Sequence, residues 1–130
     1  MENINKQERR DDRISIMEKL FTYDMTGEYV FLNPIDDYSD FVNDTVNYVC
    51  SNLEKVDEVI KNSLVKYTIT RLSFVDRAII RMATAEMMMG TAKAVVINEA
   101  LEIVKVYSDQ GDGASVRFVN KVLDNISKNI

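Results

Sequence analysis

The chain of 130 residues is 46% hydrophobic and 28% charged, carries a formal net charge of −5, and contains one Cys and no His. This length and composition suit one folded unit with its own core, so we expect residues 1–130 to form a single domain. Without His, and with Cys50 alone, the chain lacks the commonest general base and metal ligand, so we expect no enzyme, metal site or cofactor.

The composition and the first periodic segment favour an all-α fold. Four Gly and one Pro are too few for the tight turns of a β-sandwich or barrel. Residues 8–25 place Ile14, Met17, Phe21 and Met25 at helical spacing, and Gly27 is a natural helix stop. The spacing therefore predicts a first helix over residues 8–25.

Two further helices are expected between the only Pro and residue 66. Asp36 or Asp37 can cap the first of them. Its apolar stripe consists of Tyr38, Phe41, Val42, Thr45, Val49 and Leu53, and the shorter second helix carries Val56, Val59, Ile60 and Leu64. Acidity is concentrated in this region, because residues 28–58 hold eight acidic residues and one Lys. Other faces of the protein are therefore free to be positive.

A central helix is expected from Ser73, which can cap it with acidic Asp76 three positions later, to Gly90. Its helical wheel shows a very wide apolar arc, which predicts burial on most sides. The remaining stripe contains Arg77, Arg81, Thr84 and Met88.

The last two helices follow without a linker. Thr91 can cap a helix that continues to Tyr107, and a final helix starts near Ala114 after the loop SDQGDG. The acids of this loop do not have the spacing of a calcium-binding loop. We therefore predict a bundle of six or seven helices, counting short turns, in one domain.

Three sets of charged residues are candidates for a site, and the first two have both a functional and a structural interpretation. Arg77 and Arg81, one turn apart, could clamp a phosphate or a partner's carboxylate, but the pattern alone favours the solvated edge of an amphipathic helix. Glu86 lies on the apolar arc; as a lone carboxylate without a candidate partner, it is interpreted as a core hydrogen-bond anchor rather than a general acid. Three further arginines form a small basic cluster that two acids interrupt: Arg9, Arg10 and Arg13, with Asp11 and Asp12 between them.

The N-terminal residues and the apolar runs indicate the cellular location of the protein. The segment MENINKQERRDDR has no apolar signal core, and no apolar run approaches the roughly 20 residues that span a bilayer. With a single Cys, these features predict a soluble protein of the reducing cytoplasm, without a membrane partner.

Three blocks of the sequence, taken in order, resemble the NusB family of transcription antitermination factors. The N-terminal RRDDRISIMEKLFTYD is similar to the family's arginine-led first helix with its Leu–aromatic pair, here Leu20 and Phe21. The central YTITRLSFVDRAIIRMATAEM resembles its aromatic, Arg-Leu and Asp-Arg-Ala-Ile-Leu-Arg pattern. VVINEALEIVKVY and RFVNKVLDNI resemble its C-terminal signature in order and spacing.

The resemblance implies two small helical bundles packed in one domain, no enzymatic activity, and a complex with NusE, a small-subunit ribosomal protein, on boxA-type single-stranded RNA. In that family the complex helps RNA polymerase to read through ribosomal RNA operons. A homodimer is left open. Matching motif positions imply RNA-binding residues Arg9, Arg10, Arg13, Phe21, Arg81, Tyr107, Arg117 and Phe118, and protein-partner residues Asp76 and Arg77.

Two other interpretations compete with this one. Because Asp11 and Asp12 interrupt the basic segment, the chain could be a diverged helical adaptor that binds NusE but has weak or no RNA binding. It could also be kin to the NusB-like N-terminal domain of ribosomal RNA cytosine methyltransferases, in which case a separate catalytic partner would be needed. An independent enzyme ranks last.

Overall fold

The computed structural model describes residues 5–31, 34–35 and 37–130. Within them the chain forms six α-helices and one short 3-10 turn, without a β-strand in these ranges. In chain order they are α1 (Lys6–Thr26), α2 (Asp40–Ser51), α3 (Leu53–Ser63), η1 (Ile69–Arg71), α4 (Phe74–Met88), α5 (Lys93–Tyr107) and α6 (Ala114–Lys128). The predicted all-α fold is confirmed. No helix in the described part of the chain is both long and apolar enough to cross a membrane.

Capping residues set three of the helix ends, and two of these caps, Gly27 and Ser73, were predicted. The side-chain oxygen of Asn5 accepts a hydrogen bond from the backbone N–H of Glu8 at 2.8 Å and so begins α1. Gly27 ends α1 with a φ of 77°, a conformation that side-chain-bearing residues rarely adopt. The hydroxyl of Ser73 accepts from the backbone N–H of Asp76 at 3.1 Å, which confirms the predicted start of α4.

Two predicted caps are wrong. Ser39, not Asp37, caps α2, since its hydroxyl accepts the backbone N–H three residues on, and Asp36 lies outside the described residues. Ala92 occupies the N-cap position of α5 and makes no side-chain hydrogen bond there. Thr91 does not cap α5 because its backbone N–H closes the C-terminal turn of α4 instead.

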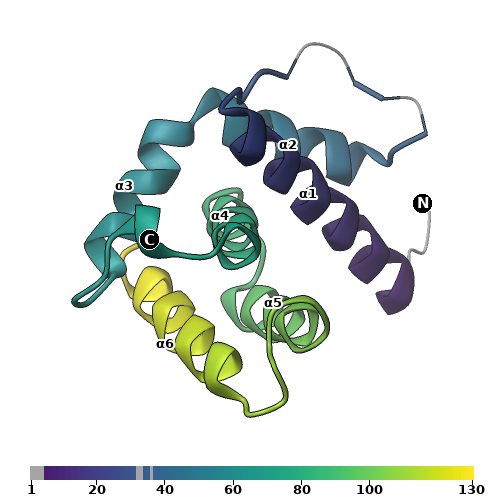
Figure 1. Cartoon of the computed structure of the whole chain (residues 1–130). Coiled ribbons are helices and arrows are strands. Elements are labelled where there is room, and N and C mark those ends of the chain that lie inside the picture. The colour runs from purple at the N-terminus through teal and green to yellow at the C-terminus, as the bar shows by residue number, and fades with distance from the viewer. Residues whose placement is uncertain (1–4, 32–33, 36) are drawn as a thin grey trace.

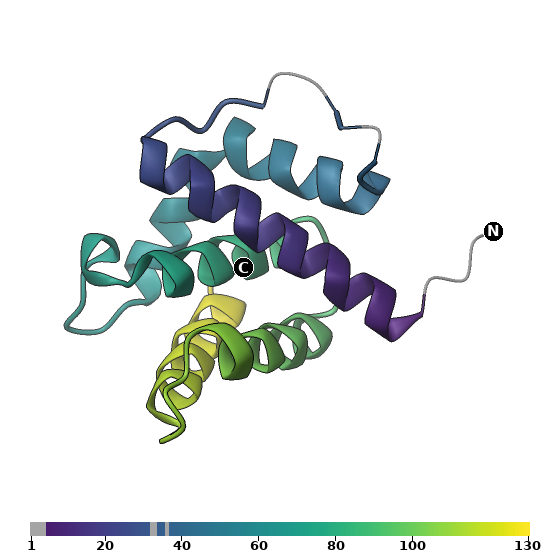
Figure 2. The ribbon, with the colours of Figure 1, turned by 45° about the vertical axis from the view of Figure 1, so that its right-hand side comes forward.

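α4 is the central helix of the fold (Figure 1). It contacts each of the other five α-helices. Figure 2 shows α1 and α2 on one side of α4, with α5 and α6 on the other. α3 closes a third side and contacts both α2 and α6. The chain thus forms two small bundles that share α4, as the resemblance implied.

The middle of α4 is buried around its whole circumference. Every residue from 77 to 87 is buried, including the charged residues Arg77, Arg81 and Glu86. The predicted central position of this helix is therefore confirmed, whereas the predicted solvated stripe is wrong. Charges in such positions need partners, since an unpaired buried charge is strongly destabilising.

Candidate nucleic-acid interface

Arg13, from the basic cluster at the start of α1, is buried and paired. Its side chain is 6% exposed, and it donates two hydrogen bonds to the carboxylate of Glu86, at 2.9 and 2.6 Å. This bidentate pair joins α1 to α4 inside the core. The interpretation of Glu86 as a core anchor is confirmed, and its partner, which the sequence did not reveal, is Arg13. The predicted contact of Arg13 with RNA does not fit this position.

Arg9 and Arg10 keep part of their surface. Arg10 donates two hydrogen bonds to Glu99 of α5, at 3.1 and 3.0 Å, and the same carboxylate lies 3.8 Å from Arg13. Arg9 places its guanidinium 4.1 Å from the ring centre of Phe41, a cation–π geometry. The side chains of Arg9 and Arg10 are 30% and 28% exposed, so these two can still reach a phosphate.

The two acids inside the basic segment have local structural roles. Asp12 accepts a hydrogen bond from the hydroxyl of Ser39 at 3.0 Å, which ties α1 to the N-cap of α2. It also lies 3.6 Å from Arg9. Asp11 accepts from the side chain of Gln7 at 2.9 Å within α1. Their presence therefore has an explanation that does not involve RNA.

Glu99 gives the fold a dependence on pH. The hydrogen bond from Arg10 and the charges of Arg10, Arg13 and Lys6 outweigh burial and hold the pKa of Glu99 below its ordinary value of 4.5. A carboxyl whose pKa is lower in the folded chain stabilises the fold fully above its unfolded pKa and loses this contribution as pH falls through the folded pKa. We therefore expect the free energy of unfolding to fall as pH drops below about 4.5.

Urea unfolding of the wild type and of Glu99→Gln, from about pH 7 to pH 3, measures this contribution. The variant should be less stable at neutral pH and should lose less stability on acidification. Glu54→Gln, which changes an exposed residue of α3, serves as the control. Parallel pH profiles for the wild type and Glu99→Gln would contradict the assignment.

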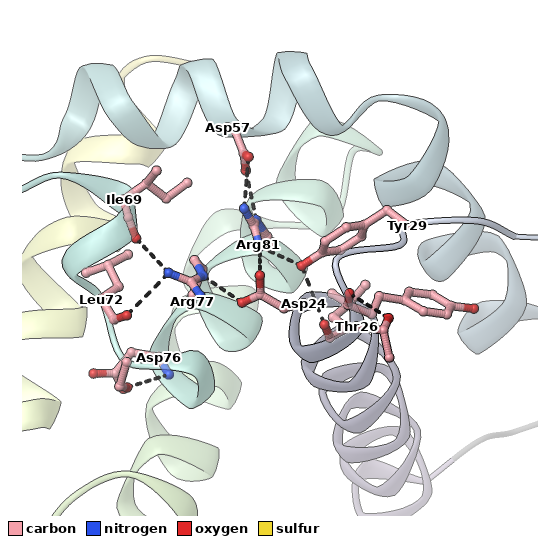
Figure 3. Close-up of polar contacts among 12 residues, drawn as sticks. Asp24, Thr26, Tyr29, Asp57, Ile69, Leu72, Asp76, Arg77 and Arg81 are labelled. Carbon is pink, nitrogen blue, oxygen red and sulfur yellow. Dashed lines mark hydrogen bonds and ion pairs between the residues drawn. The ribbon is translucent and has the colours of Figure 1, made fainter.

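Arg77 and Arg81 hold α4 to two other helices (Figure 3). Arg81 donates from Nε and Nη2 to the two carboxylate oxygens of Asp57 on α3, each at 2.9 Å. Arg77 donates from Nε to Asp24 near the end of α1, at 2.6 Å. Asp24 also lies 3.4 Å from Nη1 of Arg81. The two guanidinium groups thus converge on one carboxylate of α1.

The Nη1 groups of both arginines also find acceptors. Nη1 of Arg77 donates to the carbonyls of Ile69 and Leu72, at 3.2 and 3.4 Å. Nη1 of Arg81 donates to the hydroxyl of Tyr29 at 2.5 Å, and burial raises the pKa of Tyr29 to about 12, so this hydroxyl stays neutral. Arg77 and Arg81 are 9% and 7% exposed. The predicted RNA contact of Arg81 and the predicted partner contact of Arg77 do not fit this enclosed network.

An aromatic pair, in which Tyr67 is exposed and Phe118 is half-buried, lies on another side of α4. The rings of Tyr67 and Phe118 have their centres 5.2 Å apart, and the guanidinium of Arg71 lies 5.2 Å from the ring centre of Tyr67. Tyr67 is 44% exposed. A groove of about 390 Å³ runs between these residues and the N-termini of α4 and α6. Exposed rings beside an arginine suit an unstacked base and its phosphate.

Sequence reasoning missed Tyr67 and Arg71 as site residues. Both lie in a short segment before α4 whose polar character is typical of a connecting loop. The available signal was an aromatic residue and an arginine four positions apart, directly before a capped helix. That spacing places them close together only if the segment turns, as it does at η1.

Arg117 and Tyr107 lie at the same end of the molecule. Arg117 is exposed next to Phe118, and its Nη1 donates to the carbonyl of Asp112 at 3.3 Å. Tyr107 is 46% exposed at the end of α5. The next residue donates its hydroxyl hydrogen to Asp76, which lines the groove, at 2.5 Å. Of the three predicted residues at this end, Phe118 lines the groove, whereas Arg117 and Tyr107 are sequence neighbours of residues that line or contact it.

Phe21 contacts a second aromatic residue at the N-terminus of α4. The ring of Phe21 packs edge to face on Phe74 at 6.1 Å, and Phe74 is 41% exposed. Asp76, two residues further along α4, is partly exposed. Met25, one turn after Phe21 on α1, is 57% exposed. These residues give α1 and α4 a common apolar surface with a carboxylate at its side.

Charge pairing separates two groups of cations. Arg10, Arg13, Arg77 and Arg81 all pair with carboxylates of neighbouring helices. Within the described ranges, no ion pair involves the cations around the Tyr67–Phe118 pair: Lys66, Arg71, Arg117 and Lys121. Lys19, Lys55, Lys61 and Lys93 also form no ion pair among the described residues, but the four cations named before them lie together beside an aromatic pair. This side of the protein therefore combines unpaired cations with aromatic rings, and the partly exposed Arg9 and Arg10 add positive charge at the start of α1.

The family model described as "NusB family" matches residues 3–128. The chain belongs to the NusB family. A Bacillus cereus relative named Transcription antitermination protein NusB is 39% identical over 127 residues, which cover 91% of this chain and 95% of the relative. A relative of the same name from Bacillus thuringiensis has the same identity and coverage. The predicted family is confirmed, and with it the predicted class of function, transcription antitermination without enzymatic activity.

Solved NusB structures have the same fold. The chain is 27% identical to the protein in "T. maritima NusB, P3121, Form 2", with a TM-score of 0.77 and coverage of 98% of this chain and 93% of that one. A chain of "Crystal Structure of Antitermination Factors NusB and NusE in complex with dsRNA" is 24% identical, with a TM-score of 0.77 over 97% of this chain and 100% of that one. The second likeness supports the fold alone.

Membership of the NusB family leaves the individual site residues of this chain as predictions, which the geometry revises. Arg13, Arg77 and Arg81 are withdrawn from the contact surfaces because their side chains are enclosed by the protein. The residues that remain available to RNA are Arg9, Arg10, Tyr67, Arg71, Tyr107, Arg117 and Phe118.

Proposed function

We propose that this NusB family chain binds boxA-type single-stranded RNA together with NusE, and that the complex helps RNA polymerase to transcribe ribosomal RNA operons in the cytoplasm. Residues 1–130 serve as a single RNA-binding domain in this proposal. The observation that carries it is the Tyr67–Phe118 ring pair, in which Tyr67 is exposed and Phe118 is half-buried, beside Arg71 and Arg117, neither of which pairs with a carboxylate in the described part of the chain.

Each residue type has a distinct task in such an interface. Exposed rings accept unstacked bases, at about 1–3 kcal/mol per stacked base. Arg71 and Arg117 meet phosphates without first giving up a carboxylate partner. Arg9 and Arg10 add positive charge at the start of α1, where about a third of each side chain is free.

The net charge of the chain explains why a second protein is needed. At −5, the chain binds RNA weakly alone, because phosphate binding depends on cations that displace counterions. A basic partner supplies the missing charge. For NusE we propose the apolar surface of Phe21, Met25 and Phe74. Asp76 lies at the groove, where its Oδ1 accepts from Ser108, and its second carboxylate oxygen remains the predicted contact for a partner's cation. Phe21, predicted as an RNA contact, is thus reassigned by its contact with Phe74.

We expect the heterodimer with NusE of the same organism to bind boxA RNA more tightly than this chain alone, and more tightly than a scrambled RNA. The logarithm of the association constant should fall linearly with the logarithm of salt concentration. Combining Arg71→Gln with Arg117→Gln should make this slope shallower by about 1.4, because each single-strand phosphate contact contributes about 0.7. Gel shifts or fluorescence anisotropy across a salt series measure both quantities.

The charge-matched control combines Lys55→Gln with Lys61→Gln, which removes two exposed lysines from α3, on the acidic side of the protein. This variant should leave the slope almost unchanged. Equal and salt-insensitive binding of boxA and scrambled RNA would exclude the proposed function.

The adaptor interpretation, which Asp11 and Asp12 suggested in the sequence, gains one structural observation, the pairing of Arg10 and Arg13 with Glu99 and Glu86. It predicts a stable heterodimer with NusE that binds no RNA at any salt concentration. The unpaired cations around Tyr67 argue against it, because an adaptor without RNA has no need for a basic, aromatic surface there.

A further inference from the structure

A second groove adjoins the Tyr67–Phe118 pair on the side away from α4. It has a volume of about 430 Å³, in the usual range of about 300–1,000 Å³ for small-ligand sites, and lies between α6 and the segment that follows α3. Leu64, Val65 and Val122 give it apolar walls, and Lys66 and Lys121 stand in its lining. We call it the Lys66–Lys121 groove.

The walls of this groove are held in place by hydrogen bonds between α6 and the end of α3. The side-chain amide of Asn125 donates to the carbonyl of Ser63 at 3.3 Å, and that of Asn129 donates to its hydroxyl at 2.8 Å. Lys66 has a φ of 60°, the left-handed region, which turns the chain along the groove. The groove is thus part of the packed structure.

The charge of the lining distinguishes this groove from the groove on α3. The residues that line it include Lys66 and Lys121 and no carboxylate, and neither lysine forms an ion pair among the described residues. The groove on α3 is lined instead by Glu54, Asp57 and Glu58 with a single lysine. An anionic ligand is therefore favoured at the Lys66–Lys121 groove and disfavoured at the other.

The groove is continuous with the proposed RNA interface. Tyr67 and Phe118 line both this groove and the neighbouring one that contains Arg71. A polyanion that stacks on these rings can extend across them into the apolar space between the two lysines. A single-stranded nucleic acid fits this combination, because it alternates phosphates with flat bases that apolar walls accept.

We propose that the Lys66–Lys121 groove binds nucleotides that flank boxA on the same RNA strand, so that this chain contacts a longer RNA segment than the boxA element. The proposal rests on the proposed function. Lys66 and Lys121 contact flanking phosphates, and a flanking base enters the apolar space beside Phe118. The contact adds affinity without sequence specificity, since stacking and phosphate contacts accept any base.

The test measures RNA binding by the heterodimer with NusE, for boxA RNA alone and for boxA RNA extended by about six uridines at the 5′ end or the 3′ end. One of the two extensions should tighten wild-type binding by roughly tenfold, the effect of one stacked base with its phosphates. Lys66→Asn combined with Lys121→Gln should abolish this gain and leave binding of boxA alone unchanged. Asn tolerates the positive φ at position 66 and Gln suits a helix, so both changes preserve the fold.

The Lys55→Gln and Lys61→Gln double variant is again the matched control and should keep the gain. Extensions that bring no gain to the wild type, or a groove variant that weakens both RNAs equally, would overturn the proposal while boxA binding still supports the proposed function. Loss of NusE binding in the groove variant would assign the groove to the protein partner and would also overturn it. If the wild-type heterodimer binds no RNA, both proposals fail.

Discussion

Replacing Arg13 with alanine should lower the free energy of unfolding by about 3–5 kcal/mol, the largest effect expected of any substitution in the basic segment. The variant leaves the carboxylate of Glu86, whose side chain is 2% exposed, without the two hydrogen bonds that Arg13 donates. Glu99 is 3.8 Å from Arg13 but retains Arg10, so most of the cost arises at Glu86. Denaturant unfolding measures the loss.

Two further variants test whether the loss of stability comes from leaving one member of the Arg13–Glu86 ion pair unpaired. Glu86→Ala should cost a similar amount, because it leaves Arg13 buried and unpaired. Arg13→Met combined with Glu86→Leu should recover much of the stability, since an apolar pair of similar volume often replaces a buried ion pair at little cost. A loss below about 1 kcal/mol for Arg13→Ala, together with weaker RNA binding, would return Arg13 to the RNA surface.

The features that the sequence predicted correctly are local ones. The periodicity of apolar residues located the helices, and Ser73 and Gly27 fixed two of their ends, because caps act within a few residues of the chain. The wide apolar arc of residues 74–89 also identified the central helix. Each of these signals is contained in one segment and needs no knowledge of the neighbouring helices.

The partners of the buried charges could not be predicted in this way. Arg13 and Glu86 are 73 positions apart, and Arg77 and Asp24 are 53 positions apart. A helical wheel shows which side of a helix is polar, but not whether another helix covers that side. One signal was available: Asp24 lies in the last turn of α1, where the helix dipole disfavours a carboxylate, so a nearby cation was to be expected.

Some residues of the candidate site could likewise be predicted from the sequence, and others could not. Motif positions identified Phe118, which lines the groove, and the exposed residues Arg117 and Tyr107. They also selected Arg13 and Arg81, because a motif contains residues that build the fold as well as residues that contact ligands. Burial together with carboxylate pairing separates the two kinds: an enclosed cation bonded to a buried carboxylate supports the structure, and an unpaired, exposed cation is available to RNA. Arg10 combines both features, since it pairs with Glu99 and keeps 28% of its side chain exposed.

The pairing criterion is tested most sharply by comparing Arg81 with Arg71. Arg81→Ala should lower the free energy of unfolding by about 2–4 kcal/mol, because Asp57 and the hydroxyl of Tyr29 lose their buried partner. The lower end allows for Asp57, whose side chain is 28% exposed and can be partly rehydrated. Asp24 keeps its hydrogen bond from Arg77 and adds little to the loss.

Arg71→Ala should have the opposite effects, with stability almost unchanged and RNA binding weakened. Arg71 is exposed, its guanidinium lies beside the ring of Tyr67, and its side chain forms no ion pair among the described residues, so the change in stability should stay within about 0.5 kcal/mol. Binding of boxA RNA by the heterodimer with NusE should weaken, and its salt slope should become shallower by about 0.7. The RNA affinity and its salt slope are measured at a temperature where circular dichroism shows each variant to be fully folded.

A double-mutant cycle of Arg81→Ala with Asp57→Ala measures how much of the lost stability comes from the Arg81–Asp57 ion pair. The two residues are in direct contact, so their coupling energy should lie in the range of about 0.5–3 kcal/mol, whereas Arg71 and Asp57 should show additive effects. Folded Arg81→Ala protein should bind RNA as tightly as the wild type. A folded Arg81→Ala variant with near wild-type stability and weakened RNA binding would show that carboxylate pairing does not distinguish structural from ligand-binding arginines in this protein.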